Sequence, residues 1–126
     1  MKIKLPKLPK ISEEKLQEQC VHWFRMQFRN KIIFAIPNGG KRSAFEAYRM
    51  KKGGVLAGVP DLCVPHKTLF GQSALYIELK VKPNKPTPIQ LELMDKLFKA
   101  GNMVEVVYDF ETFVNVITKY ISRDAI

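Results

Sequence analysis

Long apolar runs are missing from this sequence of 126 residues, although hydrophobic residues make up 46% of it. No stretch approaches the roughly 20 consecutive apolar residues that span a bilayer. The basic start, Met1 to Lys10, is not followed by the apolar segment that a secretory signal requires. These absences argue against a membrane-spanning or secreted protein, and they predict an intracellular one, in the cytoplasm or at the nucleoid.

Cysteine is scarce as well, since Cys20 and Cys63 are the two that the sequence contains. Their positions fit neither a metal-ligand spacing nor a disulfide framework. Each lies among apolar residues, so we expect both to be buried as small hydrophobic side chains.

Acidic residues are few compared with basic ones. The chain has 12 Asp and Glu against 21 Lys and Arg, which gives a formal net charge of +9. For one small domain this imbalance favours a polyanionic partner. Nucleic acid, a membrane surface and an acidic protein all attract cations, so charge alone does not choose among them.

The pattern along the chain is that of one α/β domain. Residues 1–11 alternate Lys with Ile, Leu and Pro and predict a flexible basic arm, whereas residues 12–126 predict a single domain. Apolar periodicity and caps predict helices over residues 13–29, 43–52 and 88–100 and from residue 110 onwards. Runs of β-branched and aromatic residues predict strands over 31–36, 61–64, 74–81 and 103–108. This order predicts one mixed β-sheet flanked by helices. The expected helical core residues are Leu16, Cys20, Trp23, Phe24, Phe28, Leu93, Met94, Leu97, Phe98, Phe113, Val114, Ile117 and Tyr120.

The clearest predicted strand, residues 74–81, carries an acid and a base on one face. Because side chains alternate along a strand, Glu78 and Lys80 share a face with Tyr76, opposite Leu75, Ile77, Leu79 and Val81. Charged groups on a strand of this kind must be paired or bind something to offset their desolvation. A structural ion pair and a functional site are both consistent with this pattern.

Asp61 favours the functional interpretation. It opens the strand 61–64, which is close enough in sequence to the strand 74–81 to form a hairpin with it. Such a hairpin can bring the Asp61 carboxylate beside Glu78, and two adjacent carboxylates call for a shared proton or a bound cation. Mg²⁺ suits one or two carboxylates, and with Lys80 nearby the set makes phosphodiester hydrolysis plausible.

Five segments carry a family resemblance. They are Glu13-x-x-Leu16-Gln17 with Trp23-Phe24, Pro37-Asn38-Gly39-Gly40-Lys41-Arg42, Gly58-Val59-Pro60-Asp61-Leu62, Ile77-Glu78-Leu79-Lys80 and Pro88-x-Gln90. In this order, over about residues 13 to 121, they resemble the VRR-NUC branch of the PD-(D/E)xK nuclease superfamily. The resemblance implies a restriction-endonuclease-like fold and cleavage of DNA that depends on Mg²⁺ or Mn²⁺.

The resemblance also implies roles for individual residues. Asp61 and Glu78 are expected to hold the metal together with the backbone carbonyl of Leu79. Lys80 is expected to serve the attacking water or the charge of the transition state. The family places a further acid on the first helix, and here the pattern points to Glu13. Glu14 is one position away and stays an alternative, and Glu18 is a weaker one. Each of these acids could also have no role in the site and simply be exposed to solvent.

Gln90 has two interpretations. It falls in the motif that follows the lysine in this family, which implies a place in the active site. It also completes a capping box with Thr87, ahead of a helix that has Pro88 at its first position. The sequence leaves both open.

Basic residues near these motifs are candidate DNA contacts. Asn38-Gly39-Gly40-Lys41-Arg42 offers backbone N–H groups and two cations to a phosphate, although a plain turn with solvated charges has the same composition. Lys82 and Lys85 follow the strand 74–81 directly and are expected to reach phosphates too.

Two functions fit the sequence. The first is a metal-dependent DNA endonuclease, for which the resemblance implies Holliday-junction or flap-like substrates and a two-fold homodimer. The second is a non-catalytic, basic DNA-binding module of a replication or repair complex. The intact set of two acids and a lysine favours the enzyme, because a pure binder does not require it.

The basic segment gives the first testable prediction. Replacing both Lys41 and Arg42 by Ala should weaken DNA binding and flatten its salt dependence, because each lost phosphate contact lowers the slope of log K against log salt by about 0.9 for B-DNA. Anisotropy titrations of a labelled duplex at salt concentrations from about 50 to 200 mM measure this slope. An unchanged slope would place the binding surface elsewhere.

Overall fold

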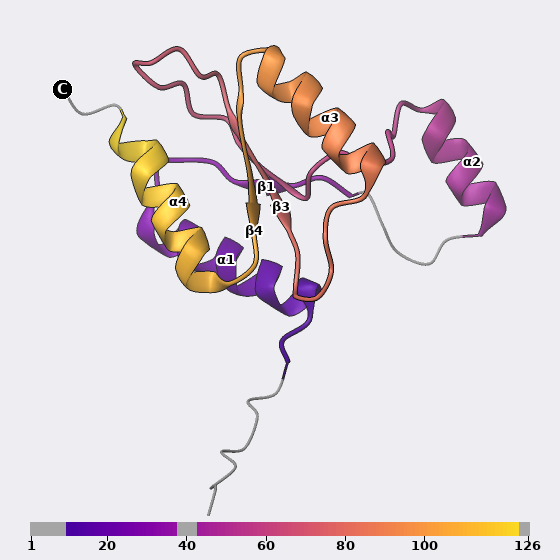
Figure 1. Cartoon of the computed structure of the whole chain (residues 1–126), viewed down its shortest axis with the longest axis horizontal. Coiled ribbons are helices and arrows are strands. Elements are labelled where there is room, and N and C mark those ends of the chain that lie inside the picture. The colour runs from indigo at the N-terminus through magenta and orange to yellow at the C-terminus, as the bar shows by residue number, and fades with distance from the viewer. Residues whose placement is uncertain (1–9, 38–42, 124–126) are drawn as a thin grey trace, which may run out of the picture.

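The structure is a computed structural model that describes residues 10–37 and 43–123. Its elements are α1 (Glu13–Gln27), β1 (Phe34–Ala35), α2 (Ala44–Lys52), β2 (Leu62–Val64), β3 (Leu75–Leu79), α3 (Pro88–Lys99), β4 (Met103–Val107) and α4 (Phe110–Ser122), as Figure 1 shows. The predicted order of helices and strands is therefore confirmed. The segment Asn38–Arg42, for which a DNA contact is predicted, lies outside the described residues.

The four strands form one mixed sheet in the order β1-β2-β3-β4. β1, β2 and β3 pair antiparallel, and β2 and β3 are the predicted hairpin, with Leu62 opposite Ile77. β3 and β4 pair parallel, and α3 makes the connection between them, since a parallel pair needs a crossover.

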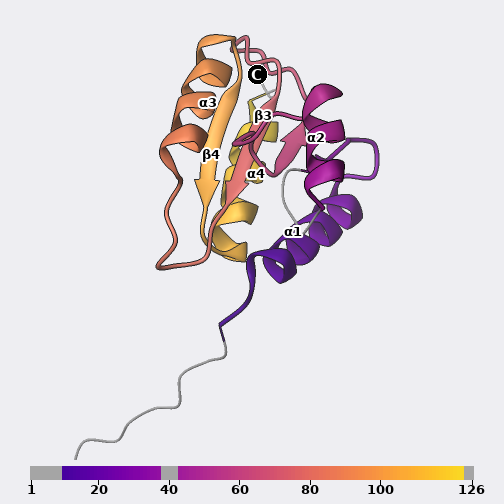
Figure 2. The ribbon, with the colours of Figure 1, turned by 90° about the vertical axis from the view of Figure 1, so that its right-hand side faces the viewer.

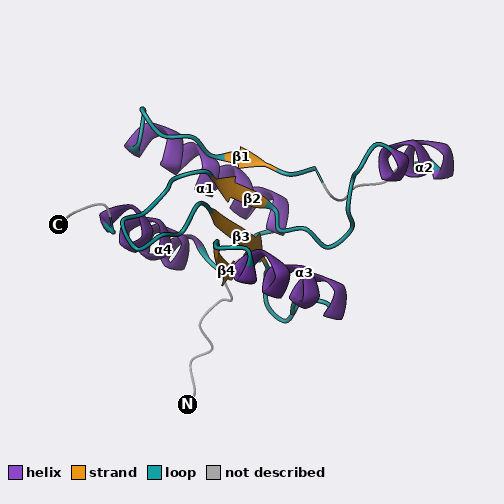
Figure 3. Ribbon diagram, turned by 90° about the horizontal axis from the view of Figure 1, so that it is seen from above, coloured by secondary structure: helices purple, strands orange, loops and turns teal. Residues whose placement is uncertain are grey.

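Helices cover both faces of the sheet, as Figure 3 shows from above. α1 and α4 share one face, where their side chains and those of the strands form the hydrophobic core. α3 lies on the other face, against β4 (Figure 2). The core consists of Leu16, Cys20, Phe24, Ile33, Leu62, Val64, Leu75, Ile77, Leu79, Val107, Phe113, Ile117 and Tyr120.

The alternation predicted for β3 is confirmed. Leu75, Ile77 and Leu79 are buried in the core that α1 and α4 cover. Glu78 therefore points to the opposite face, the one on which α3 lies, and its neighbour Lys80 follows directly after the strand. The sequence pattern thus places a charged pair on the less apolar side of the sheet.

Three of the helices begin at a capping side chain. The side-chain oxygens of Ser12, Thr87 and Asp109 each accept the backbone N–H three residues on. Thr87 and Gln90 form the reciprocal capping box, with Pro at the start of α3. These caps satisfy N–H groups that a helix start otherwise leaves without partners.

Several predicted bounds and core positions are wrong. The strand 31–36 is reduced to β1, because its partner β2 is itself only three residues long and Pro37 has no N–H to donate. The strands 61–64, 74–81 and 103–108 are also shorter, since pairing ends where a neighbour ends.

Phe98 is not a core residue, since it is 62% exposed. α3 packs mainly on the edge strand β4, so it covers only a narrow stripe of the sheet, and Met94 is its one buried residue. Val114 is half-buried for a similar reason, because Phe113 and Ile117 face the core from α4.

Both cysteines are buried and free, as expected from the sequence. Within residues 10–37 and 43–123, no helix has the length and apolar character needed to cross a bilayer.

Gly58 holds the approach to β2 against α3. Its φ is +90°, and a Cβ there would lie 2.6 Å from Cγ2 of Ile89 and 3.2 Å from Cδ1 of Leu93. Ile89 is β-branched and in a helix, so its side chain has little freedom to move away. A glycine is therefore required both by conformation and by close contact.

Gly58→Ala should lower the free energy of unfolding by about 2–4 kcal/mol, the sum of left-handed strain and overpacking. Gly54→Ala is the matched control, because Gly54 has a φ of +101° and no atom within 4 Å of an added Cβ. It should cost only about 1 kcal/mol. Urea unfolding measures both, and equal losses would refute the close approach of Gly58 to α3.

Candidate active site

Asp61 lies just before β2 and touches the end of β3. The register that sets Leu62 opposite Ile77 continues to Asp61 opposite Glu78. The Leu79 backbone N–H donates to Oδ2 of Asp61 at 2.8 Å. Pro60, directly before it, is buried and fixes the entry of the strand. The hairpin therefore places the Asp61 carboxylate beside that of Glu78.

Glu78 is almost fully buried, with 2% of its surface exposed. Its Oε1 accepts a hydrogen bond from Nε2 of Gln90 at 3.1 Å and lies 3.6 Å from Nζ of Lys80. Its Oε2 is buried and finds no hydrogen-bond partner among the described residues. One oxygen is thus held by two donors, and the other is left without one.

Lys80 is buried as well, with 9% exposure. Its backbone N–H donates to the Val107 carbonyl at 3.0 Å, which fixes the residue beside the end of β4. Its ammonium group is held next to Glu78 in a place where water screens little. The acid and the base that share a face in the sequence pattern therefore form an ion pair.

The charge of Asp61 disfavours the ionisation of Glu78. Burial, followed by the negative charge of Asp61, raises the pKa of Glu78 to about 7, and Lys80 opposes the shift. Burial also raises the pKa of Asp61, while the hydrogen bond from the Leu79 N–H opposes that rise. Excess negative potential at this point favours a cation.

Glu13 adds to this potential from α1. It is half-buried at the first position of the helix, and its charge raises the pKa of both Asp61 and Glu78. By contrast, Glu14 is exposed, and Glu18 pairs with Lys15 at 3.3 Å on the solvent side. Among the three first-helix acids considered in the sequence, Glu13 is the one that lies near the pair.

Asn84 is a residue that the sequence analysis did not single out. Its Nδ2 donates to Oε1 of Glu13 at 3.3 Å, across 71 residues of sequence. An isolated Asn in a polar loop gives no signal of such a contact, because the contact depends on how α1 packs beside the sheet.

Gln90 forms the predicted capping box and also contacts Glu78. Its Oε1 accepts the Thr87 backbone N–H at 2.9 Å, which completes the capping box. Its Nε2 donates to Glu78. A primary amide has an acceptor and a donor end, so the capping of α3 also orients the carboxylate.

The remaining predicted residues lie around this cluster. Lys82 and Lys85 are exposed in the loop after β3. The hydrogen bond from the Thr112 N–H lowers the pKa of Asp109, and the charge of Lys82 adds to this shift. Leu79 is buried, with its N–H committed to Asp61.

The donor set fits a hard divalent cation. Two carboxylates lie side by side, and Oε2 of Glu78 lacks a donor that would satisfy it within the described part of the chain. No group of three His, Cys, Asp or Glu side chains suited to a metal occurs among residues 10–37 and 43–123. Mg²⁺ is commonly bound by one or two carboxylates and keeps several waters, so it does not need a third.

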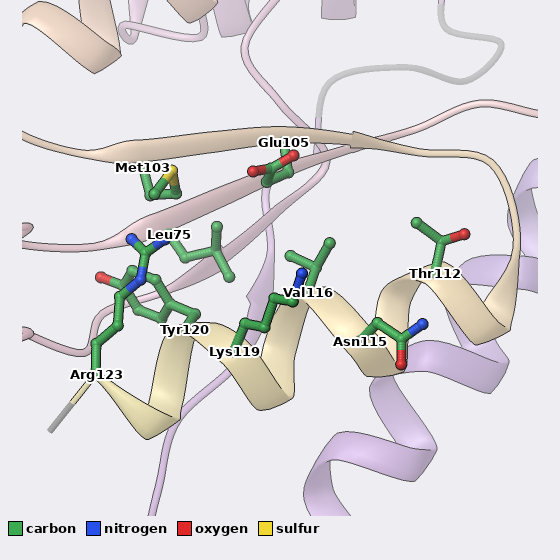
Figure 4. A pocket seen from close by; sticks show the side chains of 9 residues that line it. All are labelled: Leu75, Met103, Glu105, Thr112, Asn115, Val116, Lys119, Tyr120 and Arg123. Carbon is green, nitrogen blue, oxygen red and sulfur yellow. The ribbon is translucent and has the colours of Figure 1, made fainter. Parts of the chain in front are cut away.

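A separate hollow of about 270 Å³ lies between β4 and α4 (Figure 4). Its polar lining includes Glu105, Lys119 and Arg123. None of the site residues predicted from the sequence lines it, so it is distinct from the cluster around Asp61 and Glu78.

The mixed sheet with helices on both faces, together with an acid pair and a lysine at the end of a hairpin, defines a restriction-endonuclease-like fold. The solved structure of a VRR_NUC domain protein superposes on this chain with a TM-score of 0.75 and 27% sequence identity, over 91% of this chain and 92% of that one. No family model and no curated protein sequence matches the chain. The chain therefore has the fold of the VRR-NUC family.

The raised pKa of Glu78 leads to a prediction about stability in metal-free solution. A carboxyl group whose pKa is higher in the folded state stabilises the fold below its unfolded pKa, near 4.5, and this contribution is lost as the pH rises towards about 7. Glu78→Gln removes the ionisation. The difference in unfolding free energy between Glu78→Gln and wild type should therefore change in favour of the variant by about 2–3 kcal/mol as the pH rises from about 4.5 to 7.5, since one pKa unit is about 1.4 kcal/mol.

Urea unfolding in EDTA at several pH values measures this difference. Glu92→Gln is the control, because Glu92 is an exposed carboxylate paired with Lys96 on α3. A difference between Glu78→Gln and wild type that does not change with pH would contradict a buried, repelled carboxylate.

Proposed function

We propose that this chain is a divalent-metal-dependent deoxyribonuclease that hydrolyses phosphodiester bonds. The observation that carries the proposal is the pair formed by the half-buried Asp61 and the buried Glu78, with Lys80 beside it, in a chain with the VRR-NUC fold. A protein that only bound DNA would gain nothing from setting the buried Glu78 carboxylate beside Asp61, because burial and the charge of Asp61 both oppose the ionisation of Glu78.

Asp61, Glu78 and the Leu79 carbonyl would hold Mg²⁺ or Mn²⁺. When bound, such an ion supplies a Lewis acid for the phosphate and lowers the pKa of a coordinated water. The orphaned Oε2 of Glu78 supports this assignment, since a buried oxygen without a donor is otherwise destabilising.

The other residues of the site would orient the two carboxylates and offset the charge that develops on the phosphate. Gln90 holds Oε1 of Glu78 and so orients the carboxylate with its second oxygen left available. The Leu79 N–H donates to Oδ2 of Asp61 and so orients that carboxylate. Lys80 would orient the attacking water or stabilise the charge that develops on the phosphate. Because Lys80 is buried, its electrostatic interaction with that charge is stronger than it would be in water. Glu13 would act at the rim of the site, held by Asn84.

DNA would be held by the basic surface. The net charge of +9 and the exposed Lys82 and Lys85 close to the site support contacts with phosphates. We extend the proposal to branched or flapped DNA and to a homodimer, because cutting two symmetric strands needs two sites related by a two-fold axis.

Lys80→Met tests the chemistry with little change in packing, because Met keeps most of the apolar stem. Cleavage should fall by roughly 10²-fold or more, the scale of a lost acid–base or electrostatic contact. Binding of DNA should change little, because the other cations remain. Single-turnover nicking of supercoiled plasmid with Mg²⁺ or Mn²⁺ and a melting curve on the same preparation measure both.

Lys96→Met is the matched control, because Lys96 is exposed on α3, pairs with Glu92 and is not among the proposed site residues, so this variant should cut at nearly the wild-type rate. Because Lys80 pairs with the buried Glu78, Lys80→Met should also destabilise the fold, by about 3–5 kcal/mol, so cleavage is compared per folded molecule. A folded Lys80→Met that cuts like wild type would remove Lys80 from the active site.

A further inference from the structure

α2 carries aromatic and basic side chains along one side. Phe45, Tyr48, Arg49 and Lys52 follow the spacing i, i+3, i+4, i+7, which places them on one helical face. Cζ of Arg49 lies 5.8 Å from the ring centroid of Phe45, and Nζ of Lys52 lies 4.8 Å from that of Tyr48. We call these four residues the α2 stripe. Each ring in it is paired with one cation.

The rings of the α2 stripe face solvent. Phe45 is 68% exposed and Tyr48 is 56% exposed, although each has a cation over the ring. Aromatic side chains in such numbers on one face mark an interaction site more often than a plain surface.

α2 makes little stabilising contact with the rest of the domain. It stands apart from the helices that cover the sheet (Figures 1 and 3), and within the described residues none of its side chains is buried. It has nine residues, held at its start by the Ser43 side chain. Isolated helices shorter than about 12–15 residues are marginal in water, so a partner on the stripe would stabilise it.

The charge of α2 narrows the choice of partner. Its basic residues are Arg49, Lys51 and Lys52, and Glu46 is its one acid. Two copies packed through this surface would bring like charges together, which is destabilising. A polyanion that also offers flat aromatic faces complements both features, and unpaired nucleotides have this chemistry.

The position of α2 in the chain ties it to the active site. The chain leaves the sheet after Ile36, forms α2 and returns at Asp61, and the Ile36 N–H donates to the Asp61 carbonyl at 2.8 Å. The segment that contains α2 therefore begins and ends beside Asp61.

We propose that the α2 stripe binds single-stranded DNA, with Phe45 and Tyr48 stacking on unpaired bases and with Arg49 and Lys52 contacting the adjacent phosphates. This inference rests on the proposed function and narrows its substrate class. The preferred DNA has a single-stranded segment next to the cleaved bond, as flaps and opened junctions do.

Phe45→Ala combined with Tyr48→Ala tests the stacking without cleavage. Anisotropy of a labelled oligothymidine in EDTA should show a loss of affinity of about tenfold or more, since stacking on an aromatic ring contributes roughly five- to 150-fold per base. Affinity for a duplex should change by less than about twofold, because paired bases are not available to stack. Arg49→Ala with Lys52→Ala should instead flatten the salt dependence on oligothymidine.

Two control pairs match these variants. Leu69→Ala with Phe70→Ala removes exposed apolar side chains from the turn between β2 and β3, and Lys96→Ala with Lys99→Ala removes exposed cations from α3. Phe45→Trp with Tyr48→Phe keeps both rings and should retain binding. All these positions are exposed, so the melting temperature should not change.

The outcomes separate the two proposals. If wild type binds neither oligothymidine nor duplex, the proposed function fails and this inference fails with it. If wild type binds both and the ring variant binds oligothymidine as wild type does, or loses duplex equally, only the α2 stripe is refuted. A ring variant that turns a wild-type dimer into a monomer in sedimentation would assign the stripe to a protein interface and also overturn the inference.

Discussion

The closeness of the buried Glu78 carboxylate to the half-buried Asp61 carboxylate is the constraint on which the rest of this structure depends. The antiparallel register of β2 and β3 sets Asp61 beside Glu78, where burial raises the pKa of both carboxyl groups and the charge of Asp61 raises that of Glu78 further. The nearby groups reduce this penalty only in part. The Leu79 N–H holds Asp61, and Gln90 and Lys80 hold one oxygen of Glu78. The other oxygen of Glu78 has no donor among the residues that the structure describes, and this supports the proposed cation site over a purely structural ion pair.

This arrangement explains why structural details far from the strands matter. The capping box of α3 uses the same Gln90 amide that orients Glu78, so the start of that helix must keep its place. Gly58 allows the chain before Asp61 to pass directly against Ile89, the residue before Gln90. Stability is given up locally at the acid pair and recovered in the core on the opposite face of the sheet.

The sequence predicts the parts of this site that depend on local rules. Alternation along residues 74–81, the short hairpin and the capping box place Glu78, Lys80, Asp61 and the start of α3, because each follows from a period or a turn. Glu13 comes only from the family resemblance, and Asn84 from nothing in the sequence, because their contact depends on how α1 packs. The length of β1 and the exposure of Phe98 were predicted wrongly, since both depend on the extent of a neighbouring element.

The measurement that tests the central claim most directly is calorimetric titration of Mn²⁺ into the metal-free protein at neutral pH. Wild type and the exposed-carboxylate control Glu92→Gln should each bind a divalent ion with the same affinity. Asp61→Asn and Glu78→Gln should both remain folded, and each should lose at least about tenfold in affinity, because a ligand of the cation has been removed. Equal affinity in all four proteins would contradict a metal site at the Asp61–Glu78 pair.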